Sequence, residues 1–343
     1  MPRGPGLRRR EDLFSTRGQA EGCHGPGVCI LSPTVDLRFS CGPVQFANPV
    51  FTASGAFGYG IEYLDVVDVA GLGGIVTKTL TVEPRAGNPQ PRVRELRHGM
   101  LNSIGLENVG LAAFVGDKLP VLREHGIDTV VSLAAREESE FSTMITELSR
   151  HDGWKAVELN LSCPNVARGG LDFGRDPHQV ERITQLALQA LPDDRALWVK
   201  LTPNVTSIGG LARGAEQGGA HAISCINTVV GLEIDLARRE PVFPRATAGY
   251  SGPAILPIAL AKVWEVANTV SIPIVGIGGI GGIDDVLSFF VAGASAVQVG
   301  TSLFARPDLG PALVQELAGR LADEGFASAS ALRSERLPTL SRS

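Results

Sequence analysis

Two amide side chains and a thiol fall within six residues of each other in the stretch ELNLSCPNV, at Asn160, Cys163 and Asn165. Residues 156–161 read as a short buried strand, and the proline and glycines that follow it end the strand in a loop. A thiolate can act as a base, and amides both donate and accept hydrogen bonds. A lone cysteine is more often a buried apolar residue, so the grouping depends on what lies around it.

Two lysines stand at or near the ends of other apolar runs. Lys78 ends GGIVTK and Lys200 lies in ALWVKL. An ammonium group is costly to bury without a partner, so each lysine either reaches solvent or lies at the mouth of a site. Ser54 ends a further run, and Asn227 and Thr228 follow another. Such a convergence of polar groups favours a functional site.

The elements that must position these residues repeat as strand, loop and helix. Short apolar runs are typical of buried parallel strands, and they occur at 50–54, 74–78, 129–133, 156–161, 196–201, 222–226, 272–277 and 296–299. Helical stretches are predicted at 61–69, 107–125, 138–150, 177–190, 207–218, 255–268, 283–292 and 309–324. Eight alternating units predict an α/β protein with a single (β/α)8 TIM barrel, and a doubly wound open sheet is the alternative.

The barrel is expected to occupy residues 34–325. The Gly-, Pro- and Arg-rich residues 1–33 predict a disordered N-terminal extension, and the Ser- and Arg-rich residues 326–343 predict a frayed tail. A small N-terminal β-hairpin is expected where 35–39 and 44–46 flank the turn SCGP.

Two loops are longer than a bare barrel needs. They cover residues 79–104 and 227–253 and follow the second and sixth strands. Long loops without secondary structure are usually functional or disordered. Both would lie on the C-terminal face, where barrels carry their active sites.

The composition excludes several classes of protein. The chain has 343 residues, of which 44% are hydrophobic and 20% charged, and its net charge is −5. This balance argues against a nucleic-acid binder, and no apolar run is long enough to cross a bilayer. The five cysteines form no CxxC pair and no metal or iron–sulfur spacing, and their odd number suits a reducing cytoplasm. We therefore expect a cytoplasmic protein without a metal.

Glycines follow the last two predicted strands, as Gly278-Gly279 and Gly300-Thr301. Glycines here let backbone N–H groups approach a phosphate, as in the phosphate site common to this fold, although tight turns alone also require them. A flavin mononucleotide (FMN) fits such a site, with its phosphate at strands seven and eight and its ring over the barrel mouth. A lysine near flavin N1 would stabilise the anion formed on reduction.

Nine stretches between about residues 37 and 307 together resemble the class 1 dihydroorotate dehydrogenases. The wording GMLN before SIGL is most similar to the 1B, NAD-linked catalytic subunit. The stretches are NPVFTASGAFGYG (48–60), GGIVTKTLTVEPRAGNPQPRV (73–93), GMLNSIGLENVG (99–110), ELNLSCPNV (158–166), VKLTPNV (199–205), CINTVVG (225–231), YSGPAILP (250–257), VGIGGI (275–280) and VGTSLF (299–304).

The resemblance implies a flavoprotein that oxidises (S)-dihydroorotate to orotate in pyrimidine (UMP) biosynthesis. It implies that Cys163 is the general base, which removes a proton from C5 while hydride passes from C6 to flavin N5. The substrate-binding residues that it implies are Lys78, Asn102, Ser103, Ile104, Gly105, Leu106, Asn160, Asn165, Asn227 and Thr228. The FMN-binding residues are Ser54, Lys78, Thr79, Ser132, Asn160, Lys200, Ile226, Gly252, Gly278, Gly279, Gly300 and Thr301.

One residue departs from the family pattern. The family usually has a flavin-contacting asparagine at the end of strand three, where VVSLAAR places Ser132. Serine is shorter, so the contact with flavin would be lost or mediated by water.

The resemblance also implies partners. The 1B branch passes electrons to a subunit that carries FAD and an iron–sulfur cluster and reduces NAD+. This chain is expected to form a homodimer. The alternative to electron transfer through such a partner subunit is a 1A-like homodimer that uses a soluble acceptor.

Other readings stay open. A tRNA dihydrouridine synthase also carries an N-x-x-C-P pattern, but it would be expected to have a basic RNA-facing surface and a further helical domain. Dihydropyrimidine dehydrogenase typically reads CPHG where this chain has CPNV. A related flavin barrel that acts on another dihydropyrimidine and a catalytically silent flavin-binding subunit also remain.

The role of Cys163 gives a first prediction. The variant Cys163→Ala should bind flavin normally, yet dihydroorotate should reduce that flavin far more slowly because the base is missing. Stopped-flow absorbance under anaerobic conditions measures this rate. Unchanged reduction would remove Cys163 as the base.

Overall fold

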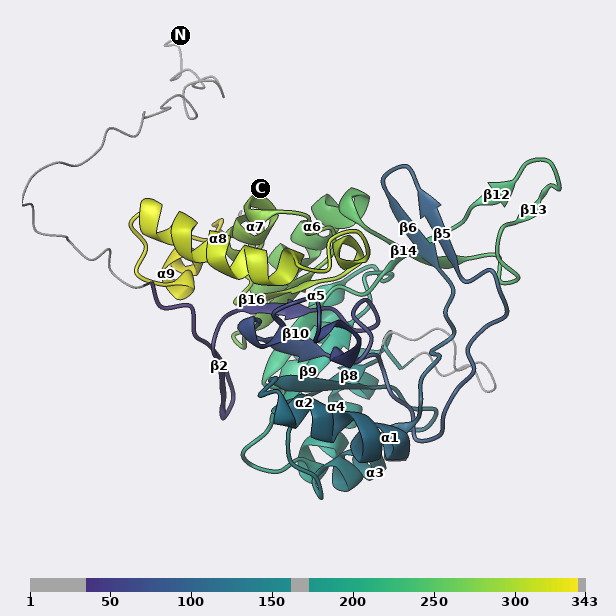
Figure 1. Cartoon of the computed structure of the whole chain (residues 1–343), viewed down its shortest axis with the longest axis horizontal. Coiled ribbons are helices and arrows are strands. Elements are labelled where there is room, and N and C mark those ends of the chain that lie inside the picture. The colour runs from purple at the N-terminus through teal and green to yellow at the C-terminus, as the bar shows by residue number, and fades with distance from the viewer. Residues whose placement is uncertain (1–34, 162–172, 339–343) are drawn as a thin grey trace, which may run out of the picture. The chain divides into compact units, whose positions relative to one another are not determined.

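Eight parallel strands close into a barrel in a computed structural model that describes residues 35–161 and 173–338 (Figure 1). The order around the barrel is the order in the chain, and the last strand pairs with the first. This closure confirms the (β/α)8 barrel and excludes the open sheet. The strands are β3 (Val50–Thr52), β4 (Gly74–Val76), β7 (Thr129–Leu133), β8 (Ala156–Asn160), β9 (Ala196–Leu201), β10 (Ala222–Cys225), β15 (Ile274–Ile277) and β16 (Ala296–Val299).

Helices follow most strands near the predicted positions. They are α1 (Leu111–Ala113), which continues through a π-helical turn (Phe114–Lys118) into α2 (Leu119–Glu124), then α3 (Glu138–Leu148), α4 (Pro177–Ala190), α5 (Ile208–Gln217), α6 (Leu256–Ala267), α7 (Ile283–Ala292) and α8 (Leu309–Asp323).

The helix predicted at 61–69 is wrong. Two short 3-10 turns, η2 (Ile61–Tyr63) and η3 (Val69–Gly71), lie there instead. Gly58 and Gly60 just before them have φ of +55° and +86°, a region that interrupts regular helix. The Asp68 side chain then accepts a hydrogen bond from the Gly71 amide and caps the second turn.

A β-hairpin closes the N-terminal end of the barrel, as expected. Strands β1 (Phe39–Cys41) and β2 (Val44–Phe46) pair antiparallel around the SCGP turn. The Phe39 and Phe46 rings pack edge-on against Phe51 and Trp198, with ring centroids 5.0–6.2 Å apart. Trp198 Nε1 lies 3.0 Å from Cys41 Sγ. This cluster also contains the first inward residues of the other strands, so it closes the N-terminal end of the barrel.

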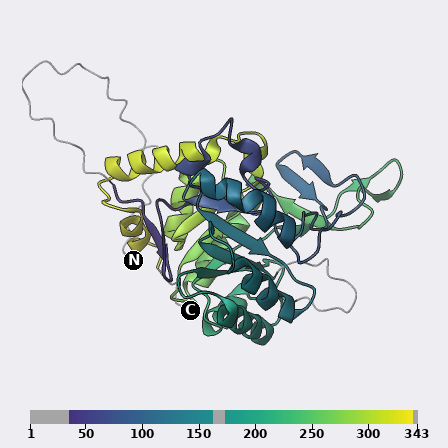
Figure 2. The same ribbon diagram turned by 60° about the horizontal axis from the view of Figure 1, so that its bottom comes forward.

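The two long loops build a second sheet. Strands β5 (Val93–Leu96) and β6 (Gly99–Asn102) come from the first loop, and β11 (Val229–Gly231) and β14 (Ala248–Ser251) from the second. They pair antiparallel in the order β11-β14-β6-β5. Figures 1 and 2 show this sheet to one side of the barrel, with the small hairpin of β12 (Ile234–Asp235) and β13 (Glu240–Pro241) beyond it.

The C-terminal region differs from the frayed tail expected after residue 325. Helix α9 (Ala329–Ser334) forms there, and Ala329 and Leu332 are buried. Asp36 pairs with Ser328 in an isolated bridge, which ties the start of the domain to its end. Residues 1–34 and 339–343 lie outside the described residues, so the N-terminal extension stays a prediction. No helix in the described part of the chain has the length and apolar character needed to cross a membrane.

The variant Phe46→Ala should lower the free energy of unfolding by about 3–5 kcal/mol, because it leaves a cavity under the barrel. Urea denaturation followed by tryptophan fluorescence measures this change. Phe304→Ala removes the same atoms from a side chain that is 57% exposed, and it should change stability far less. Equal losses in the two variants would show that the hairpin does not support the barrel.

Candidate active site

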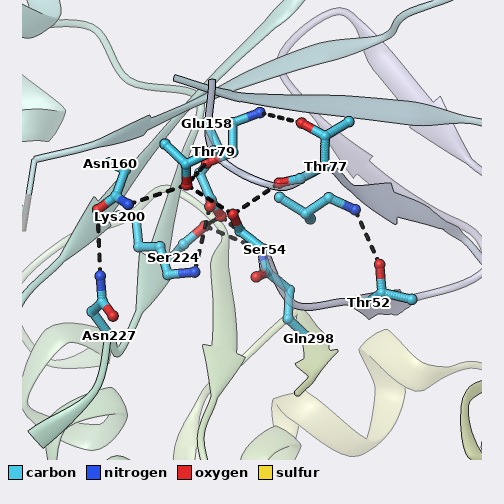
Figure 3. Close-up of polar contacts among 12 residues, drawn as sticks. Thr52, Ser54, Thr77, Thr79, Glu158, Asn160, Lys200, Ser224, Asn227 and Gln298 are labelled. Atoms are coloured by element: carbon cyan, nitrogen blue, oxygen red, sulfur yellow. Dashed lines mark hydrogen bonds and ion pairs between the residues drawn. The ribbon is translucent and has the colours of Figure 1, made fainter. Parts of the chain in front are cut away.

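A chain of hydroxyls and amides crosses the C-terminal rim of the barrel (Figure 3). The Ser54 and Thr79 hydroxyls lie 2.9 Å apart, and the Thr79 and Ser132 hydroxyls 3.0 Å apart. Asn160 Nδ2 donates to Thr79 Oγ1 at 3.3 Å, and Asn227 Nδ2 donates to Asn160 Oδ1 at 3.3 Å. The predicted residues at the ends of β3, β4, β7, β8 and β10 therefore come together in one network.

Thr79 is the centre of this network, and Ser132 is a supporting member. Ser132 is fully buried, and its hydroxyl forms a hydrogen bond with the Thr79 hydroxyl. The Ser132 amide also donates to Thr77 Oγ1 at 3.0 Å. Its position next to Thr79 shows how a serine can support the rim. Its direct contact with a cofactor remains a prediction.

A carboxylate and an ammonium are buried together just below the rim. Lys200 is 5% exposed and Glu158 is 0% exposed, and Lys200 Nζ lies 3.5 Å from Glu158 Oε1. The Ser224 hydroxyl and Gln298 Nε2 each donate to Glu158 Oε2 at 2.8 Å. Lys200 therefore does not reach solvent, which was the alternative to its place in a site.

Sequence reasoning missed Glu158, Ser224 and Gln298 as members of the site. Glu158 and Gln298 each interrupt an otherwise apolar strand, and that interruption was the available signal. Glu158 lies two residues before Asn160, so both side chains point to the same face of β8. The inward face of the barrel could be assigned only once the strands were known to close.

Lys78, the second predicted lysine, lies beside charged residues that flank the predicted substrate residues 102–106 in the sequence. Lys78 Nζ lies 3.4 Å from Glu107 Oε2, and Arg92 Nη1 lies 3.0 Å from the same oxygen. The hydrogen bond from Arg92, with the charge of Lys78, lowers the pKa of Glu107. Since Glu107 is about half exposed, this cluster orients Lys78 more than it stabilises the fold.

The predicted substrate residues 102–106 are held by the sheet of strands β11-β14-β6-β5, which is called the rim sheet below. Asn102 Nδ2 donates to the Gly249 carbonyl at 3.2 Å, and Asn88 Nδ2 donates to the Ser103 carbonyl at 3.0 Å. A Cβ on Gly249 would lie 2.5 Å from Thr228 Oγ1 and 3.4 Å from Asn102 Nδ2. The two predicted substrate residues Asn102 and Thr228 therefore both lie beside Gly249 of β14.

Several other predicted site residues lie where the backbone turns sharply or is closely packed. Gly105 and Leu106 follow Ile104 with φ of +75° and +56°, so the loop turns sharply there. Gly252 has φ of +103°, and a Cβ on it would lie 2.7 Å from the Gly99 backbone. Ile226 is buried next to Asn227.

The glycines after β15 and β16 shape the far side of the rim. Gly278 and Gly279 have φ of +128° and +80°, and a Cβ on Gly279 would lie 2.6–2.8 Å from Leu256. Side chains are excluded from both positions, which leaves bare backbone at the surface. Gly300 leads directly into the 3-10 turn η6 (Thr301–Phe304), which places Thr301 at the same edge.

The described cysteines are poor candidates for a base. Burial raises the pKa of Cys41 to about 12, and burial also raises the pKa of Cys225. Neither thiol would form a thiolate readily near neutral pH. Cys163 and Asn165 lie outside the described residues, in the segment that begins two residues after the end of β8 at Asn160.

A comparison with family models identifies the chain. Residues 36–321 match the model for dihydroorotate dehydrogenase. The chain belongs to the dihydroorotate dehydrogenase family. This is a family of flavoenzymes.

Curated relatives narrow the family to one branch. A protein of Solidesulfovibrio magneticus is 44% identical over 303 residues, which are 88% of this chain and 98% of that protein. One from Geobacter sp. (strain M21) is 42% identical over 297 residues, 87% of this chain and 97% of that protein. One from Thermoanaerobacter sp. (strain X514) is 46% identical over 274 residues, 80% and 90% respectively. All three are named dihydroorotate dehydrogenase B (NAD(+)), catalytic subunit, which confirms the resemblance to the 1B branch.

The rim network gives the next prediction. Thr79→Val removes a hydroxyl that lies within 3.3 Å of polar atoms of Ser54, Ser132 and Asn160. It should lower the free energy of unfolding by about 1–3 kcal/mol, because buried polar groups lose a partner. Thermal or urea unfolding measures it. Thr143→Val makes the same change at an exposed position on α3 and should cost less. A Thr79→Val variant as stable as this control would show that the hydrogen bonds of Thr79 do not contribute to the stability of the fold.

Proposed function

We propose that this chain is a class 1B dihydroorotate dehydrogenase, which oxidises (S)-dihydroorotate to orotate with FMN in UMP biosynthesis. The observation that carries the proposal is the convergence of Thr79, Asn160, Asn227 and buried Lys200 on one rim. This rim occurs in a chain that matches the family over residues 36–321. Relatives of nearly the same length carry the name of this activity.

The residues at the rim fit FMN. Amides and hydroxyls offer both donors and acceptors to the polar edge of a flavin ring, and the ammonium of Lys200 favours negative charge near that edge. Bare backbone at Gly278, Gly279 and Gly300 suits the phosphate. When bound, FMN supplies the acceptor for the electrons of the substrate. Ser54, Lys78, Thr79, Ser132, Ile226, Gly252 and Thr301 complete the proposed contacts.

The substrate would lie above the flavin against the rim sheet. Asn102, Asn160, Asn165, Asn227 and Thr228 are proposed to hold the cyclic amide and imide groups, with Lys78 near the carboxylate. Residues 103–106 would form the wall of the substrate site. Cys163 is proposed to take the C5 proton of dihydroorotate. A thiol needs to lose its own proton first, so the reaction should be faster above neutral pH than below it.

A partner subunit is proposed to receive the electrons. The relatives are named as catalytic subunits, which supports a complex with a second kind of chain. Among the described residues there is no group of three or more His, Cys, Asp or Glu that could hold a metal ion. An FAD and iron–sulfur partner that reduces NAD+ would supply that chemistry, and a homodimer of this chain is proposed as the core of the complex.

An anaerobic visible spectrum of the purified chain, reconstituted with FMN where needed, tests the proposal. Dihydroorotate should bleach the flavin absorbance, because the substrate passes two electrons to the flavin. Dihydrouracil, which lacks the carboxylate, should bleach it much more slowly. Bleaching by dihydrouracil alone would shift the function to another dihydropyrimidine. A bound flavin that neither compound bleaches would favour a silent flavin-binding subunit.

A further inference from the structure

Glu158 is a charged residue in the interior of the barrel to which the proposed reaction assigns no role. Its side chain is fully buried, and two donors and an ammonium converge on it. An ionised carboxylate accepts such donors and has none to offer in return. Glu158 Oε1 has no hydrogen-bond partner in the described structure, and its nearest charge is Lys200 Nζ at 3.5 Å.

Stability alone does not explain this pair. Two charges lose their hydration when they are buried, and their attraction often fails to offset that cost. Neutral residues of similar size are commonly as stable or more stable in such positions. A buried pair of this kind, directly below the proposed site, is therefore a candidate for a functional role.

The strand register places Glu158 and Lys200 at different depths in the barrel. Glu158 lies opposite Trp198, and Asn160 lies opposite Lys200. Lys200 thus starts at the level of the rim network, while Glu158 starts one layer deeper, beside Ser224 and Gln298. A ligand on the rim would meet Lys200 first. Glu158 lies farther from such a ligand and acts on it mainly by holding that lysine and offsetting its charge.

We propose that Glu158 is a positioning residue that holds the Lys200 ammonium at the barrel mouth and offsets part of its charge. This inference rests on the proposed FMN site. An ammonium near the flavin stabilises the negative charge of the reduced ring, and a carboxylate 3.5 Å from that ammonium weakens the effect. Glu158 thereby keeps the flavin from holding its electrons too tightly.

The consequence concerns the second half of the reaction. In the proposed reaction dihydroorotate would lose a hydride from C6 and a proton from C5 to the base, and FMN, when bound, would supply the acceptor for the two electrons, which would pass to NAD+ through the partner. A flavin beside an uncompensated ammonium accepts electrons readily but releases them poorly. Glu158 sets the balance between these two steps.

Sulfite titration of the FMN-loaded protein tests the proposal without substrate. Sulfite adds to flavin N5, and a positive charge near the ring stabilises the resulting anion. Glu158→Gln keeps the size and an acceptor but removes the charge, so sulfite should bind about tenfold more tightly or better. The flavin midpoint potential should rise in parallel. Glu147→Gln, a surface carboxylate on α3 with its own ion pair, is the matched control and should change neither value.

The same titration in a Lys200→Met background decides whether Glu158 acts through Lys200. Adding Glu158→Gln to Lys200→Met should then change sulfite affinity much less than Glu158→Gln changes it in the wild-type background. An unchanged or weaker affinity in Glu158→Gln, or an equal effect in both backgrounds, would overturn the proposal. Should Glu158→Gln fail to fold alone, a double variant that folds and binds FMN would show that the two charges depend on each other, and a double variant that also fails to fold would contradict that coupling.

Thermal unfolding of the apoprotein adds a readout that needs no flavin. Each single change should lower the melting temperature, because it leaves one buried charge without its partner, and the double change should recover most of the loss. Purely additive losses would contradict the coupling of the pair. Because sulfite and heat need no dihydroorotate, these results judge Glu158 even where dihydroorotate fails to bleach the flavin.

Discussion

The alternation of side chains along parallel strands is the constraint on which this structure depends. Once eight strands close, every second side chain faces an interior that has one sealed end and one open end. The hairpin rings and Trp198 fill the sealed end. The polar residues of the site lie towards the open end, where Glu158, Ser224 and Gln298 form one level and Asn160 and Lys200 the next. The site is the upper part of the same column of side chains that forms the core.

Much of this architecture was visible in the sequence for a physical reason. Strands buried on both faces are apolar throughout, so all eight appeared as short runs, and the predicted bounds differ from the structure by at most two residues. The segment 61–69 has apolar spacing that suits a helix, but glycines with positive φ and the Asp68 cap divide it into turns. Local backbone preference prevailed there over hydrophobic periodicity.

The site was predictable in part. Residues at strand ends, such as Ser54, Thr79, Asn160 and Asn227, could be assigned to one rim because barrel topology brings strand ends together. The partner of Lys200 could not, because Glu158 and Lys200 meet only through the pairing of β8 with β9. The rim sheet was also missed, because its strands come from two loops that composition alone does not connect. Long-range pairing is the information that one sequence does not display.

The rim sheet has a consequence for the order in which the protein folds. Its inner pair joins β6 with β14, whose partners Asn102 and Gly249 are 147 residues apart in the chain. Contacts of such sequence separation are slow to form, because a long loop must close first. Four of the eight barrel strands, β7 to β10, lie between these two segments, so the sheet can pair only after those strands have been synthesised. The rim sheet is thus assembled late, and a partly folded chain would lack the segment to which substrate binding is proposed.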